Sequence, residues 1–110
     1  MAISPKCKPI ASLGLMAYLS IHKALEAIHK EDYKEAYSIS GNAIGNLYLM
    51  FRTGRISGEE LEKITTPLVE AQRAYEEKDK DKMFDKLIAS AEETGEFIFQ
   101  KVVACECEGR

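Results

Sequence analysis

The stretch SISGNAIGN, residues 38 to 46, decides the fold, because it reads either as a loop or as part of a helix. Its two glycines and two asparagines are poor helix formers. A mostly apolar stripe nevertheless runs through it with a spacing of three or four residues, at Tyr33, Tyr37, Ser40, Ile44, Leu47 and Phe51. Such a spacing places these side chains on one face of a continuous helix. We therefore predict that residues 38 to 46 are helical.

Three further segments show the same period, which is carried by apolar residues from Ile10 to Ile28, from Leu61 to Tyr75 and from Phe84 to Val102. Asp32 and Ser57 each stand three residues before a glutamate, which is the capping-box spacing that opens a helix. Four amphipathic helices with short connections favour antiparallel neighbours. The sequence therefore predicts an all-α, four-helix up-and-down bundle built from two helical hairpins.

The chain of 110 residues suits one domain with one core, and we expect a single helical domain over residues 1–110. Pro67 lies within the third stripe. Because proline cannot donate the helical backbone hydrogen bond, we expect a kink or a break near it. Residues 1–8 and 105–110 fall outside the stripes and are expected to be flexible ends.

Charge and hydropathy bear on the class of partner. The net charge of −3 does not favour nucleic acid as a partner. The longest uncharged run, Pro9 to Ile21, is thirteen residues long, which is too short to span a bilayer as a helix. We expect no nucleic-acid partner, no membrane association and a cytoplasmic location. Residues 1–56 carry a formal charge of +3 and residues 57–110 a charge of −6, so the halves should attract each other, within one chain or between two.

Four small residues suggest a close crossing of the second and fourth helices. Gly41 and Gly45 are four residues apart, and Ala91 and Gly95 occupy the corresponding positions fifty residues later, in a faint internal repeat. A glycine inside a helix costs roughly 1 kcal/mol relative to alanine, and close backbone approach could offset that cost. We expect these four residues to form a packing notch. The alternatives are that the glycines are exposed and merely tolerated, or that a second copy or a ligand fills the notch.

The three cysteines should gather at one end of the bundle. Cys7 precedes the first helix, and Cys105 and Cys107 follow the last, so an up-and-down arrangement brings them together. They could bind zinc with a fourth ligand, Cys7 could form a disulfide with either of the others, or all three could be free thiols. A C-x-C spacing alone is a weak metal signal. We expect no metal and no cofactor.

The first helix carries more apolar surface than one interior can cover. Leu15, Met16 and Leu19 cannot all face the same side as Ile21 and Ala24. A dimer or another protein partner would bury the excess. Our leading hypothesis is therefore a small helical protein-interaction module without catalytic activity, which self-associates through the first helix.

A local resemblance gives the alternative. AEETGEFIFQKV, residues 91 to 102, resembles a helix of the MazG-like all-α nucleotide pyrophosphohydrolases, and LEAIHKEDYKEA, residues 25 to 36, is similar to the segment before that helix. In this family, glutamates of an EExxE motif and a following ExxD motif hold magnesium on a triphosphate. The resemblance implies a metal-dependent pyrophosphohydrolase, or a relative that has lost catalysis.

Carried onto this chain, the resemblance places Glu93 and Glu96 at the ExxD positions and Glu70 at one EExxE position. The rest of the pattern departs from the family. VEAQR, residues 69 to 73, offers one carboxylate where the motif needs three. The second-helix counterpart, IGNLY at residues 44 to 48, offers none. The alternative therefore requires Glu70, Glu93 and Glu96 to converge on one cavity as metal ligands.

Overall fold

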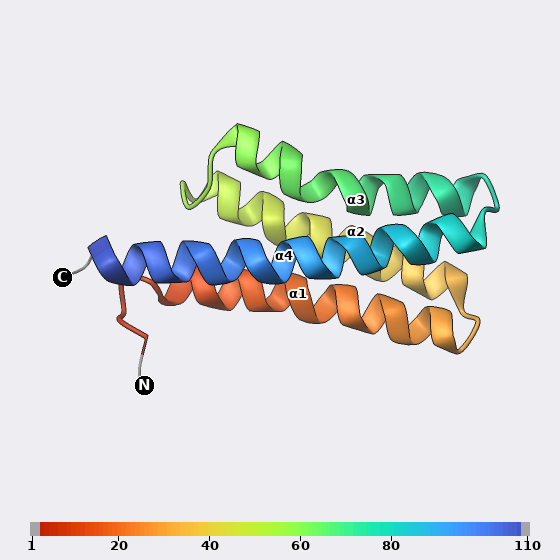
Figure 1. Cartoon of the computed structure of the whole chain (residues 1–110), viewed down its shortest axis with the longest axis horizontal. Helices are drawn as coiled ribbons and strands as arrows, with labels where there is room; N and C mark the ends of the chain where they lie inside the picture. Colours follow the sequence, from red (N-terminus) through yellow and green to blue (C-terminus); the bar gives the residue numbers. More distant parts are fainter. Residues whose placement is uncertain (1–2, 109–110) are drawn as a thin grey trace.

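The computed structural model describes residues 3–108, which form four helices in up-and-down order (Figure 1). The helices are α1 (Lys8–His29), α2 (Tyr33–Arg52), α3 (Gly58–Glu76) and α4 (Lys80–Glu108). Each helix packs against the next, and α4 returns to pack against α1. The predicted all-α four-helix bundle is confirmed.

The glycine-containing stretch at residues 38–46 lies inside α2 and is helical, as predicted. Ser40 is fully buried there, and its Oγ donates a hydrogen bond to the Ala36 carbonyl oxygen at 2.7 Å. This bond satisfies the hydroxyl without a partner from another helix. Ala43 and Leu47 are fully buried on the same face. Of the stripe read from the sequence, Ser40 and Leu47 are thus fully buried, whereas Phe51 at its end is exposed. The buried face of α2 consists of Ala36, Ser40, Ala43, Leu47 and Met50.

The two hairpin turns share one construction. Glu31 and Lys78 each adopt a left-handed backbone with φ 62°, directly before an aspartate. The side chain of that aspartate accepts a hydrogen bond at 3.1 Å from the backbone N–H three residues later, in both turns, and so caps the next helix at Asp32 and at Asp79. Two N-capping aspartates therefore start α2 and α4, the returning helix of each hairpin.

The structure differs in part from the expectations about interruptions and ends. α3 continues through Pro67, so the expected break does not occur, and a kink near the proline stays a prediction. Residues 105–108, expected to belong to a flexible end, form the last turn of α4. A disulfide between Cys7 and Cys105 ties this turn to the start of α1, which accounts for its regular structure. Residues 3–8 of the expected N-terminal flexible end form a turn that leads into α1, and Ser4 and Cys7 attach it to α4. Residues 1–2 and 109–110 lie outside the described residues.

α1 and α4 approach each other through two glycines. A Cβ atom on Gly14 of α1 would lie 2.8 Å from two side-chain carbons of Ile98 of α4. In return, a Cβ atom on Gly95 of α4 would lie 3.0 Å from a ring carbon of Tyr18 of α1. Carbon atoms in proteins prefer separations of about 3.5–4.0 Å. Each helix therefore uses a glycine to admit a large side chain of the other.

The prediction of a packing notch between α2 and α4 is wrong. Gly41 and Gly45 lie on the exposed side of α2: a Cβ on Gly45 would meet nothing within 4 Å, and one on Gly41 only Gln72, at an ordinary 3.5 Å. Ala91 and Gly95 instead lie beside α1, in a groove that they share with Tyr18. The topology of the bundle explains the difference. Each helix packs against its neighbours in the sequence, and α4 packs against α1, so α2 and α4 lie diagonally opposite each other.

Two glycine-to-alanine variants should shift stability in opposite directions. Gly14→Ala forces a methyl group into Ile98 and should lower the free energy of unfolding by about 1–3 kcal/mol. Gly45→Ala adds a methyl group to open space on a helix and should raise it by up to about 1 kcal/mol. Urea unfolding followed by circular dichroism measures both. A destabilised Gly45→Ala variant would restore the α2–α4 notch and contradict the packing described.

Candidate functional site

The candidate site is an apolar groove between α1 and α4. Its volume is about 600 Å³. Apolar side chains dominate its lining, chiefly those of Ile3, Leu15, Tyr18, Ile98, Phe99 and Val102. The charged residues among its lining are Glu92 and Glu96, both from α4. The groove therefore suits an apolar side chain from another molecule better than it suits a polar substrate.

The groove lies within a wider exposed apolar surface. Phe99 is 70% exposed and Leu15 54% exposed. Leu19 and Val103 stand one helical turn beyond them, on the same helix faces, and are 49% and 44% exposed. We call this surface the α1–α4 face and define it as Ile3, Leu15, Leu19, Phe99 and Val103.

Two of the three predicted interface residues, Leu15 and Leu19, belong to the α1–α4 face. Met16 is 53% exposed but lies about 100° around α1 from Leu15, outside the groove lining. Sequence reasoning missed Phe99 and Val103, which belong to the same surface on α4. Phe99 and Val103 stand four residues apart, and each directly follows a residue of the apolar stripe, Ile98 or Val102. This second apolar row beside the stripe is the signal that could have found them.

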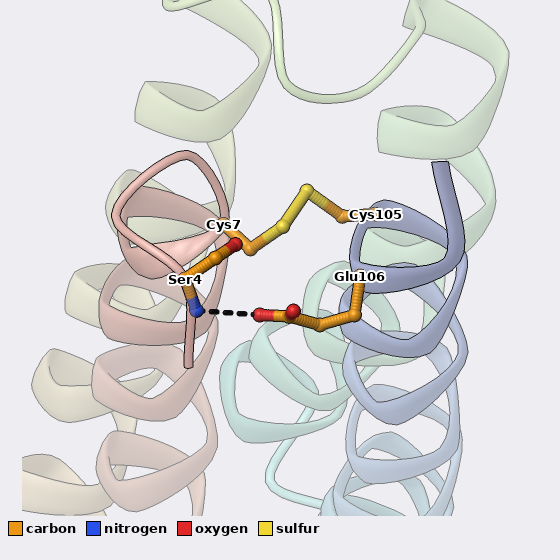
Figure 2. Close-up of a disulfide and its surroundings, with 4 residues drawn as sticks. All are labelled: Ser4, Cys7, Cys105 and Glu106. Atoms are coloured by element: carbon orange, nitrogen blue, oxygen red, sulfur yellow. Dashed lines mark hydrogen bonds between the residues drawn. A yellow bond between two sulfur atoms is a disulfide. The ribbon is translucent and has the colours of Figure 1, made fainter. Parts of the chain in front are cut away.

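The cysteines lie together at one end of the bundle, and two of them are bonded. Cys7 and Cys105 form a disulfide, with a Cα–Cα distance of 5.9 Å (Figure 2). Cys7 is fully buried, whereas Cys107 is exposed and free. Of the alternatives left open by the sequence, the structure thus contains the disulfide. Within residues 3–108, no group of three or more His, Cys, Asp or Glu side chains is arranged to hold a metal ion.

The three carboxylates implied by the MazG-like resemblance do not converge. Glu93 and Glu96 are exposed and line a groove of about 470 Å³ between α3 and α4, which also contains Lys63. Glu70 instead pairs with Lys86, at 3.0 Å. Lys86 precedes Glu93 by seven residues, so Glu70 is held about 10 Å along α4 from the level of Glu93. The predicted ligand set is therefore not assembled.

Glu60 is a third carboxylate of this groove, beside Glu93 and Glu96, and its two oxygens already have partners. Its Oε1 accepts a hydrogen bond from the Ser57 backbone N–H at 2.9 Å, and its Oε2 pairs with Lys101 at 2.9 Å. The Ser57 hydrogen bond is the largest cause that lowers the pKa of Glu60, and Lys101 lowers it further. These contacts cap α3 and bind it to α4, which is a structural role.

Comparisons of the chain with protein-family models, with curated proteins and with solved structures found no match. No helix within residues 3–108 combines the length and the hydropathy needed to cross a membrane.

Loss of the disulfide should destabilise the bundle. The disulfide joins residues that are 98 positions apart and so closes a long loop. Cys7→Ser should therefore lower the free energy of unfolding by about 2–5 kcal/mol under oxidising conditions. Cys107→Ser is the matched control and should unfold like the wild type. Thiol titration of the oxidised wild type should count one free thiol per chain. A count of three, or a peptide map that links Cys7 to Cys107, would contradict the pairing.

Proposed function

We propose that this protein is a small helical interaction module that self-associates through the α1–α4 face. The observation that supports the proposal is the exposed apolar surface that continues from α1 across the groove to α4. In a monomer this surface would face water. A second copy would cover it, and a role in assembly needs no catalytic group.

The size of the face fits a protein interface. Its five side chains expose on the order of 500 Å² of largely apolar area, within the roughly 300–600 Å² of the largest apolar patch on a typical monomer, and such patches are often functional. A standard interface buries roughly 800 Å² per partner, of which somewhat more than half is apolar. One α1–α4 face therefore supplies about the apolar area that one side of a stable dimer needs.

The charges favour a second copy as the occupant. α1 carries two lysines and one glutamate, a formal charge of +1, whereas α4 carries four lysines and seven acidic residues, a charge of −3. A two-fold axis that lies in the face and runs parallel to the helices sets α1 of each copy against α4 of the other, and this is the arrangement that we propose. The two helices with opposite charge then meet across the interface, and the like-charged helices are kept apart.

The cytoplasmic location and the absence of a nucleic-acid partner remain predictions. The disulfide restricts the predicted cytoplasmic location, because disulfides persist mainly in oxidising compartments and in intracellular proteins of hyperthermophiles. A cytoplasm that reduces thiols would leave Cys7 and Cys105 unbonded. The redox state of the compartment therefore bears on the bundle end where the groove lies.

Sedimentation equilibrium tests the self-association. We expect the oxidised wild type to be a dimer at tens of micromolar, and Phe99→Glu to weaken the dimer more than a hundredfold, or by about 3 kcal/mol, because it buries an unpaired charge. Val69 on α3 is 37% exposed and lies outside the face, so Val69→Glu is the matched control and should dimerise normally. A monomeric wild type, or equal weakening by both variants, would reject the proposal.

A further inference from the structure

We propose that the Cys7–Cys105 disulfide controls self-association, by holding an N-terminal strap, residues 3–7, against the end of the α1–α4 face. This inference rests on the proposed self-association and adds its regulation. It requires that the strap be attached to α4, that it contribute to the groove, and that the attachment be open to a reductant.

The strap is attached to the last turns of α4 at two points. Cys7 is bonded to Cys105, and the backbone N–H of Ser4 donates a hydrogen bond to Glu106 Oε1 at 2.7 Å (Figure 2). Between these points the strap is a tight turn, because the Cys7 N–H donates to the Ser4 carbonyl oxygen at 3.0 Å. The path of residues 3–7 is thus set by α4 and not by α1 alone.

The strap contributes one residue to the groove. Ile3 lines it together with Leu15 of α1 and Phe99 of α4, and remains 39% exposed. Ile3 directly precedes Ser4, and the hydrogen bond from Ser4 to Glu106 holds this part of the strap beside α4. The oxidised chain therefore presents a groove with three walls, of which the strap is one.

A second, basic pocket gives access to the disulfide. This pocket, of about 510 Å³, is lined by Cys105 and by Lys6, Arg55 and Lys101, among other residues. Cys105 is partly exposed, whereas Cys7 is fully buried, so a reductant reaches the Cys105 sulfur first. Nearby cations stabilise a thiolate that approaches Cys105. The disulfide is thus placed for exchange with an external thiol.

A dithiol reductant would reduce the disulfide in two exchange steps. One thiolate of the reductant attacks the Cys105 Sγ, which forms a mixed disulfide and releases the Cys7 thiolate. The second thiol of the reductant then displaces Cys105 and closes the reductant's own disulfide. The two protons of the dithiol end on Cys7 and Cys105, which are reduced while the reductant is oxidised.

Reduction should free the strap. Its described contacts to α4 then fall to one partly buried hydrogen bond, from Ser4 to Glu106. One such bond does not offset the backbone freedom that residues 3–6 regain. Ile3 then leaves the groove. A dimer can regain the contact with Ile3 only if it orders the strap again, which costs conformational entropy. The oxidised form is therefore the form that associates tightly.

Sedimentation equilibrium on the full chain, with and without dithiothreitol, tests the inference. We expect reduction to weaken the dimer about tenfold, while circular dichroism shows that the bundle stays folded. Cys107→Ser should keep this response. Ile3→Ser, measured with the disulfide intact, should weaken the dimer to a similar extent and respond little to reduction.

Equal dimer affinity in the oxidised and reduced states would overturn the inference and leave the proposed function standing. A monomeric oxidised protein would instead reject the proposed function and the inference with it. If the reduced chain unfolds, the oxidised Ile3→Ser variant decides the matter, since wild-type affinity in that variant would show that the strap is no part of the interface.

Discussion

The close contact between α1 and α4 is the interaction on which the rest of the structure depends. Gly14 admits Ile98 and Gly95 admits Tyr18, so the first and last helices pack at short range. Because these helices are the first and the last, their contact closes the bundle and brings the two ends of the described chain together. The disulfide and the groove both lie along this contact.

The same contact explains why apolar side chains remain at the surface. Tyr18 and Ile98 use the space that the two glycines leave, and Leu15 and Phe99 beside them have no interior to enter. A groove between the helices is the result, and it is apolar because both helices are apolar there. The strap adds a wall to it at the end where α4 and the start of α1 are bonded covalently.

The helical period and the capping residues predicted the fold, because both are local properties of the sequence. They show which face of a helix is buried but not which neighbour covers it, and this is why the notch was assigned to the wrong pair of helices. Gly14 lies within the buried stripe of the first helix, whereas Gly41 and Gly45 lie off the stripe of the second. Topology placed Cys7 near Cys105, yet only side-chain geometry could select the bonded pair.

Nuclear Overhauser contacts at the two glycines test the central contact most directly. We expect cross-peaks in the oxidised protein between Gly14 Hα and the Ile98 methyl groups, and between Gly95 Hα and the Tyr18 ring. We expect no contact from Gly41 or Gly45 to α4. Absence of both predicted cross-peaks, or contacts from Gly45 to α4 in their place, would contradict the close contact between α1 and α4.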